Sequence, residues 1–127
     1  MSNVQKTVKP GDLRGVRVLV VEDQWHVANA LRSLLEVEGM EVSGPAGKTA
    51  DAHRLADEHK PELAVVDINL KGEMPYSLIE DLNDRGVRVV VISGYAVLPG
   101  LSAKVAAILQ KPFNGPELFA SLRRALL

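Results

Sequence analysis

The sequence predicts an α/β fold, a doubly wound five-stranded parallel sheet with helices on both faces, and two observations support it. Five short apolar runs alternate along the chain with segments whose apolar residues recur at helical spacing. The runs are almost continuously apolar, which is typical of parallel strands that are covered on both faces. Because crossovers between parallel strands are right-handed, the connecting helices are expected on both sides of the sheet.

The elements follow from these runs and from the residues that end them. The predicted strands cover residues 16–21, 40–43, 63–66, 87–92 and 105–109. The predicted helices cover residues 25–38, 47–59, 75–85 and a last segment that begins after Asn114. Gly39 and Gly86 follow the first and third helices, where a left-handed turn commonly ends a helix.

The last third of the chain carries one strong helix signal and one interrupted helix. Asn114 can cap the final helix, with Pro116 in its first turn and Glu117 three residues after the cap. A fourth helix is expected over residues 95–103, but Pro99-Gly100 lies in its middle and predicts a short or broken one.

Length and composition predict one globular domain without an obvious nucleic-acid or membrane partner. The 127 residues suffice for one sizeable core, and the net charge of −1 provides no basic footprint for nucleic acid or an anionic membrane. No apolar run is long enough to span a bilayer. The polar segment 1–15 is predicted as a flexible tail, and residues 16–127 as the domain.

The chain has no cysteine, which excludes a disulfide framework and thiolate metal sites and fits a reducing compartment. The first residues contain two lysines but no apolar stretch of the kind found in a secretory signal. We therefore expect a cytoplasmic protein.

Polar residues of functional type stand at the ends of four predicted strands. They are Glu22-Asp23 after the first strand, Asp67 after the third, Ser93 after the fourth and Lys111 after the fifth. The carboxyl ends of parallel strands share one edge of the sheet, and open α/β sheets bind their ligands beyond that edge. These residues are therefore expected to lie together.

Three carboxylates in one place need a counter-charge. Two like charges about 4 Å apart repel by on the order of 4 kcal/mol at an effective dielectric near 20. Such a group must take up a proton, bind a cation, or both. Carboxylate oxygens with room for water and phosphate suit Mg²⁺, and Lys111 offers a compact positive charge for a carboxylate or a phosphoryl oxygen. The sequence thus predicts a site that holds a metal ion and receives a phosphoryl group.

Four motifs give a resemblance to a known family. From Val16 to Leu127 the chain resembles the receiver domains of bacterial response regulators in two-component signalling. The matching pieces are the acidic pair of VLVVED, the aspartate ending LAVVD, the hydroxyl-small pair of VVISG and the lysine-proline of QKPF. Each motif is weak alone, but all four stand in the right order, each after its own strand. The resemblance implies a flavodoxin-like sheet with strand order 2-1-3-4-5.

The resemblance also implies a role for each site residue. Asp67 would accept a phosphoryl group from a histidine kinase or histidine phosphotransfer protein. Asp23 and Asp67 would bind Mg²⁺ directly with the backbone carbonyl of Asn69, and Glu22 would act largely through water. Lys111 and Ser93 would contact the phosphoryl group.

The same resemblance implies that the chain is a phosphoacceptor rather than an enzyme, apart from its own phosphoryl uptake and hydrolysis. Output would come from binding an unknown downstream protein, and a homodimer is one arrangement open to it. Pro112 would follow the lysine in a bend that commonly contains a cis bond.

Two departures from the family pattern concern the switch. Ile108 stands three residues before the lysine, where receiver domains usually carry Tyr or Phe. The aromatic side chain that usually reports phosphorylation is therefore absent from this position. The span from Ser93 to Lys111 is also short. Together with ISGY these departures resemble a subgroup of stand-alone receivers with a modified switch, typically Phe-Ala-Thr-Gly-x-Tyr, but the match is partial.

Other interpretations stay open at this point. A pseudo-receiver would bind partners without phosphorylation, and Ile108 favours it somewhat. Asp23 could cap the following helix as well as bind metal. An aspartate-nucleophile phosphatase would need Asp-x-Asp after the first strand, a flavin-binding module would need a hydroxyl- and glycine-rich loop there, and a Rossmann domain would need G-x-G-x-x-G. The chain has none of these three patterns, which argues against a phosphatase, a flavin-binding module and a Rossmann domain.

Overall fold

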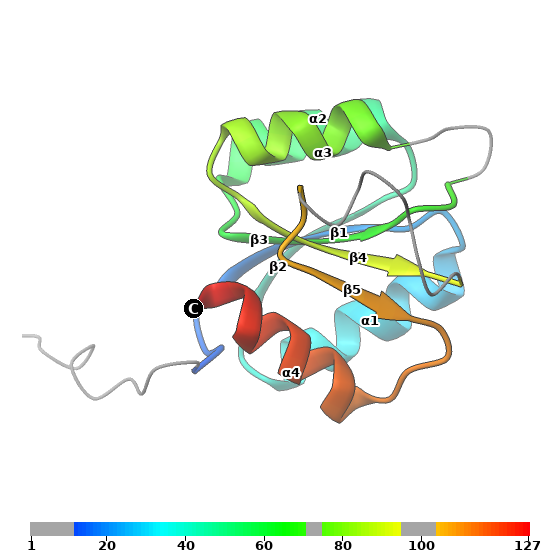
Figure 1. Cartoon of the computed structure of the whole chain (residues 1–127), viewed down its shortest axis with the longest axis vertical. Coiled ribbons are helices and arrows are strands. Elements are labelled where there is room, and N and C mark those ends of the chain that lie inside the picture. Colours follow the sequence, from blue (N-terminus) through cyan, green and yellow to red (C-terminus); the bar gives the residue numbers. More distant parts are fainter. Residues whose placement is uncertain (1–11, 71–74, 95–103) are drawn as a thin grey trace, which may run out of the picture.

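A computed structural model of the chain describes residues 12–70, 75–94 and 104–127 (Figure 1). In chain order the elements are β1 (Arg17–Val21), α1 (Trp25–Val37), β2 (Glu41–Ala46), α2 (Thr49–His59), β3 (Leu63–Asp67), α3 (Tyr76–Asp84), β4 (Arg88–Ser93), β5 (Ala107–Gln110) and α4 (Gly115–Leu126). All neighbouring strands are parallel, in the order β2-β1-β3-β4-β5. The predicted α/β fold and strand order are confirmed. The helix expected over 95–103 lies outside the described residues.

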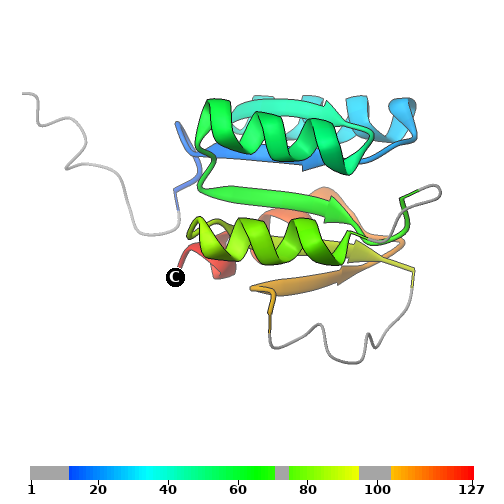
Figure 2. The ribbon, with the colours of Figure 1, turned by 90° about the horizontal axis from the view of Figure 1, so that it is seen from above.

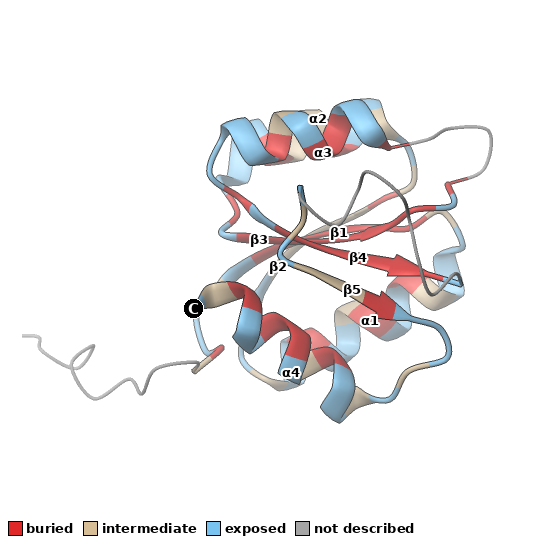
Figure 3. Cartoon of the chain, viewed as in Figure 1, coloured by how far each residue is buried: buried red, intermediate tan, exposed pale blue. Residues whose placement is uncertain are grey.

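The helices form two layers because the strands alternate their side chains between the two faces of the sheet. Helices α2 and α3 cover one face, and α1 and α4 cover the other (Figures 1 and 2). On β1, for example, Leu19 and Val21 pack under α2 and α3, whereas Val18 and Val20 pack under α1 and α4. The central strands are therefore buried along almost their whole length (Figure 3).

Strand β2 is longer than predicted, and Gly44-Pro45 is the reason. The predicted strand ends at residue 43, directly before Gly44-Pro45, a pair that usually signals a turn. Instead β2 continues to Ala46 at the edge of the sheet, with a register irregularity opposite Leu19–Val21 and a cis Gly44–Pro45 bond. An edge strand tolerates proline at such an irregularity because one side of it needs no partner.

The last helix begins as the sequence predicts. The Asn114 side chain accepts a hydrogen bond from the backbone N–H of Glu117 at 2.8 Å, and the Glu117 carboxylate accepts one from the Asn114 N–H at 2.9 Å. This reciprocal pair satisfies two N–H groups that the first turn of a helix leaves without partners. It fixes the chain directly after Lys111 and so supports the site described below.

Part of the segment predicted as a tail packs against the core. Leu13 is buried in the core between the sheet and the layer of α1 and α4, and the Gly15 N–H donates to the Gly39 carbonyl at 2.8 Å. Among the described residues, no helix is both long and apolar enough to cross a membrane.

Candidate functional site

The three acidic residues predicted from the sequence lie together at the carboxyl edge of the sheet. Glu22, Asp23 and Asp67 each offer one carboxylate oxygen, and the three oxygens lie within 4.8 Å of one another. Glu22 directly follows β1, where its N–H donates to the Ala46 carbonyl at the end of β2, and Asp67 is the last residue of β3. The ends of two adjacent strands, β1 and β3, therefore position the carboxylates.

Asp23 does not cap the following helix, so that part of the sequence interpretation is wrong. The residue at the N-cap position of α1 is Gln24, whose own side chain makes no capping hydrogen bond. The Gln24 N–H donates to the Glu22 carboxylate at 3.1 Å. The Asp23 carboxylate has an oxygen in the acidic cluster.

Glu22 is the buried carboxyl group of the cluster that has an oxygen without a partner in the described part of the chain. Its side chain is 3% exposed, and its Oε1 atom has no hydrogen-bond partner within the described part of the chain. Burial, and then the neighbouring Asp67 carboxyl group, raise the pKa of Glu22 from 4.5 to about 7. A buried, unpaired carboxylate oxygen beside two further carboxylates is the kind of donor set that a hard divalent cation satisfies. The residues therefore fit Mg²⁺.

Lys111 and Asn69 complete the surroundings of Asp67. The Lys111 ammonium lies 3.3 Å from Asp67 Oδ2, and the backbone N–H of Asn69 donates to Asp67 Oδ1 at 2.9 Å. Both oxygens of this carboxylate thus have a hydrogen-bond or ion-pair partner. The Asp67 side chain is 5% exposed, whereas that of Lys111 is 43% exposed, so the cation lies on the solvent side of the acid.

Ser93 ends β4, the strand next to the one that ends at Asp67. Its side chain is fully buried, and its carbonyl accepts a hydrogen bond from the Lys111 N–H at 2.8 Å. The Lys111–Pro112 peptide is cis, as the sequence interpretation expected for this bend. Tyr95, two residues further along from Ser93, lies outside the described residues. Every predicted site residue is therefore at one edge of the sheet.

A hollow beside the acidic cluster was not predicted. It has a volume of about 430 Å³ and is lined by Asp23, Gly47, Lys48 and Asp51. Gly47 and Lys48 follow directly on the end of β2 and so lie at the carboxyl edge beside Asp23. The predicted helix start at residue 47, after the second strand, is the signal that could have placed Lys48 there.

Comparison with known proteins gives the same family. The profile of the response regulator receiver domain matches residues 18–123. The chain belongs to the response regulator receiver domain family. The transcriptional regulatory protein DesR of Bacillus subtilis is 28% identical over 117 residues, which cover 87% of this chain and 58% of DesR. The chain spans about half the length of the curated relatives it matches.

Solved structures of receiver proteins share the fold. The response regulator PhyR from Brucella abortus superimposes with a TM-score of 0.78 and 27% identity, covering 95% of this chain and 52% of PhyR. A response regulator from Burkholderia pseudomallei, solved with a phosphorylated aspartic acid, calcium ion and citrate, gives a TM-score of 0.76 and 30% identity, covering 84% of this chain and 66% of that one.

Membership of the family defines the general chemistry of the site. Receiver domains are phosphoacceptors of two-component systems and bind Mg²⁺ through an acidic pocket. They interact with a kinase or a phosphotransfer partner. The group of Glu22, Asp23 and Asp67 is such an acidic pocket in this chain.

Proposed function

We propose that this chain is a phosphorylation-dependent signalling switch that accepts a phosphoryl group on Asp67 from a histidine kinase or a histidine phosphotransfer protein. The domain extends over residues 16–127 together with the packed residues from Leu13 to Gly15, and acts by binding a downstream protein. The observation that carries the proposal is the buried Asp67 carboxylate, held between Lys111 at 3.3 Å and the carboxylates of Glu22 and Asp23. A cytoplasmic location stays a prediction.

The transfer step uses Asp67 as the nucleophile. A carboxylate oxygen attacks the phosphorus atom of phosphohistidine, a new P–O bond forms, and the P–N bond to the imidazole breaks. The released imidazole keeps the electron pair and takes up a proton from solvent. Mg²⁺ held by the acidic residues would supply charge neutralisation for the transferred group. Since such transfers depend on positioning and charge neutralisation, no further covalent chemistry is required of the chain.

The remaining residues hold the ion and the phosphoryl group. Asp23 and Asp67 bind the metal with the backbone carbonyl of Asn69, and Glu22 acts largely through water. Lys111, which pairs with Asp67 in the unmodified chain, moves its contact to a phosphoryl oxygen. Ser93 donates a hydrogen bond to the same group. Its fixed place beside Lys111, through the 2.8 Å backbone contact, supports a joint response of both residues.

A relative supports this chemistry. The response regulator from Burkholderia pseudomallei, 30% identical to this chain, was solved with a phosphorylated aspartic acid and a calcium ion. A divalent cation and an aspartyl phosphate together in a relative agree with the assignment of both to the acidic edge of this sheet.

The test is phosphorylation by a small phosphodonor. The chain is incubated with acetyl phosphate and Mg²⁺, and its intact mass is measured. We expect one added phosphoryl group, which is lost with EDTA present and in the Asp67→Asn variant. Asp84→Asn, the same change at an exposed position on α3, is the matched control and should be labelled like the wild type. No added mass, or a label that persists in Asp67→Asn, would reject the proposal.

A second candidate is a pseudo-receiver whose partner binding ignores phosphorylation. It is favoured by Ile108, which occupies a half-buried position in β5 where the family usually has an aromatic readout residue. This candidate predicts that Asp67→Asn leaves partner binding unchanged. Capture of partners by the wild type with acetyl phosphate, compared with Asp67→Asn, distinguishes the two.

A further inference from the structure

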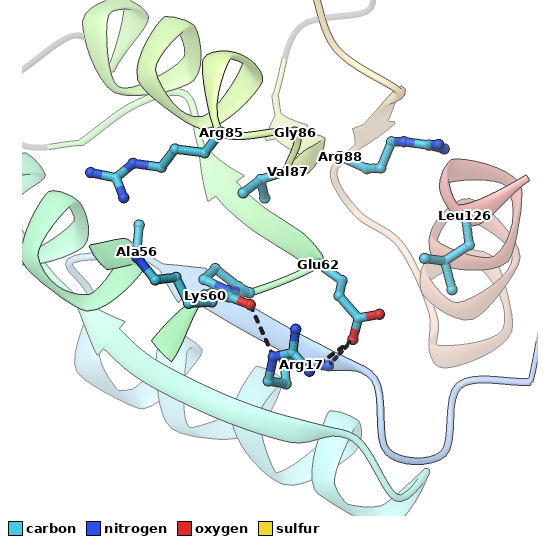
Figure 4. A pocket seen from close by; sticks show the side chains of 10 residues that line it. Arg17, Ala56, Lys60, Glu62, Arg85, Gly86, Val87, Arg88 and Leu126 are labelled. Atoms are coloured by element: carbon cyan, nitrogen blue, oxygen red, sulfur yellow. Dashed lines mark hydrogen bonds and ion pairs between the residues drawn. The ribbon is translucent and has the colours of Figure 1, made fainter. Parts of the chain in front are cut away.

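A hollow lies at the amino edge of the sheet, opposite the acidic site. It has a volume of about 590 Å³, which is within the usual size of a small-molecule pocket. It forms where α2, α3 and α4 end and β1 and β4 begin (Figure 4). None of the residues that line it belongs to the proposed phosphorylation site.

The pocket combines an apolar floor with a cationic rim. The floor is formed by Ala56, Pro61, Val87 and Leu126. The rim carries Arg17, Lys60, Arg85 and Arg88 and one acid, Glu62. Arg85 is already held by Asp81 and Asp57, at 3.2 and 3.3 Å, and its side chain extends away from Arg88 (Figure 4). Three cations and one acid therefore remain at the rim.

The simplest role for these cations is to bind carbonyl groups at helix ends. Arg17 and Arg88 each make one such contact. Arg17 Nε donates to the Lys60 carbonyl at 2.9 Å after α2, and Arg88 Nη1 donates to the Ala125 carbonyl at 2.6 Å near the end of α4. Each contact uses one of the five N–H donors of a guanidinium group. The contacts therefore hold both arginines in place and leave donors for a further acceptor.

Lys60 ends α2 with its backbone, whose N–H donates to the Ala56 carbonyl at 3.1 Å, and this leaves the side-chain ammonium available. Within the described residues Lys60 is the only non-glycine residue with positive φ, at 48°, whereas the turns after α1 and α3 use Gly39 and Gly86. Glycine adopts this conformation without the steric cost that lysine bears. The Lys60 side chain is 71% exposed, and its described ion pair, with Asp57, is long at 3.7 Å. The Lys60 ammonium therefore lies at the pocket, exposed and only loosely paired, where it can contact an anion.

We propose that this pocket binds a small organic anion, with its carboxylate or phosphate at Lys60, Arg17 and Arg88 and its apolar body on the floor. Glu62 pairs with Arg17 at 3.7 Å and selects against a second negative charge near that side of the rim. The acidic edge and this pocket are separate sites. The inference does not depend on phosphorylation of Asp67.

The probe is hexanoate, which joins a carboxylate to an apolar chain, compared with hexanol and acetate, which each lack one part. Amide shifts of the ¹⁵N-labelled full chain are followed by NMR. We expect saturable shifts at Glu62, Gly86 and Val87, with a Kd on the order of millimolar. Acetate and hexanol should shift these amides at least about five-fold less at equal concentration. Equal shifts with hexanol, or shifts scattered over the surface, would overturn the proposal.

The decisive variant is Lys60→Gly, because it removes the cation while relieving the strained backbone. We expect hexanoate affinity to fall about three- to ten-fold while the melting temperature rises by about 3 °C. Arg54→Gln, which removes one cation from the exposed side of α2, should leave the affinity unchanged. An unchanged affinity in Lys60→Gly, or an equal fall in Arg54→Gln, contradicts the assignment.

Discussion

The two edges of the sheet differ in how their charges are balanced. At the carboxyl edge, three carboxylates lie together, Lys111 contacts that of Asp67, and Glu22 Oε1 is buried without a partner in the described part of the chain. At the amino edge, arginines are held by helix-end carbonyls and by carboxylates. The first edge therefore needs an ion from outside, whereas the second is stable alone and can accept a ligand as an addition.

The difference shows why the two sites call for different kinds of evidence. An unbalanced cluster predicts its own ligand, because the charge that it lacks is defined. A balanced pocket does so less directly, through an exposed cation such as Lys60, whose described ion pair with Asp57 is long at 3.7 Å. Four predictions test this difference between the two edges.

The largest expected effect is on the phosphorylation rate. Lys111→Gln removes the cation that lies 3.3 Å from Asp67, and we expect the initial rate with acetyl phosphate to fall about 100-fold. Arg17→Gln removes a cation at the opposite edge and should change the rate less than two-fold. Rates are read from intact mass against time. Equal rates for the two variants would remove the functional distinction between the edges.

The second prediction compares two glycines. A Cβ atom at Gly44 would lie 2.6 Å from the Val20 carbonyl oxygen, and the φ of 93° is already unfavourable for alanine. Gly44→Ala should therefore lower the free energy of unfolding by about 4 kcal/mol. At Gly86 a Cβ would meet no atom within 4 Å, so Gly86→Ala should cost only about 1 kcal/mol through its φ of 80°. Urea titration measures both, and similar losses would contradict the close approach at Gly44.

The third prediction is a pH dependence that arises at the acidic edge. The folded-state pKa of Glu22 is about 7, above its ordinary value of 4.5, so the folded state binds this proton more tightly than the unfolded state. Stability is then highest below pH 4.5 for this group and falls as the pH rises to about 7. In EDTA we expect a loss of roughly 3 kcal/mol over that interval.

Two measurements assign that loss to the acidic cluster. Added Mg²⁺ should restore stability at pH 7.5, because the ion replaces the proton as the counter-charge. Glu22→Gln has no carboxyl group to titrate and should show a much flatter profile between pH 4.5 and 7.5. A wild-type profile that matches Glu22→Gln, measured by urea unfolding, would show that the raised pKa has no effect on stability.

The smallest prediction concerns the helix start beside Lys111. Asn114→Ala removes the side-chain oxygen that accepts from the Glu117 N–H at 2.8 Å, and it should destabilise the fold by about 1 kcal/mol. At the amino edge, Lys60→Gly should stabilise by a similar amount. Thermal melts of both variants should therefore shift in opposite directions, and shifts of the same sign would contradict one of the two local descriptions.

The acidic edge could be predicted from the sequence because the relevant signal is positional. Asp67 ends an apolar run, as Ser93 does, and a parallel sheet necessarily brings the ends of its strands to one edge. The capping pair of Asn114 and Glu117 was predicted for a similar reason, since its spacing depends on local helix geometry alone. In both cases a local pattern determines the three-dimensional outcome.

Other features depend on contacts that no local pattern encodes. The extension of β2 through Gly44-Pro45 requires the neighbouring β1 as a partner, and the strand predicted from the sequence ends before this pair. The amino-edge pocket assembles residues from the ends of three helices, and in the sequence Lys60 and Arg88 resemble ordinary solvated cations. The Asp23 cap was wrongly predicted because the sequence does not tell which way a carboxylate turns after a strand.

The length of the central strands determines how strongly the two edges influence each other. Strand β3 has five residues and, at about 3.3 Å per residue, separates the edges by roughly 16 Å. Unit charges at that separation interact by about 1 kcal/mol at an effective dielectric near 20, and salt reduces this further. Occupancy at one end can thus change affinity at the other only a few-fold through the electric field. Any stronger communication would require the strands themselves to shift.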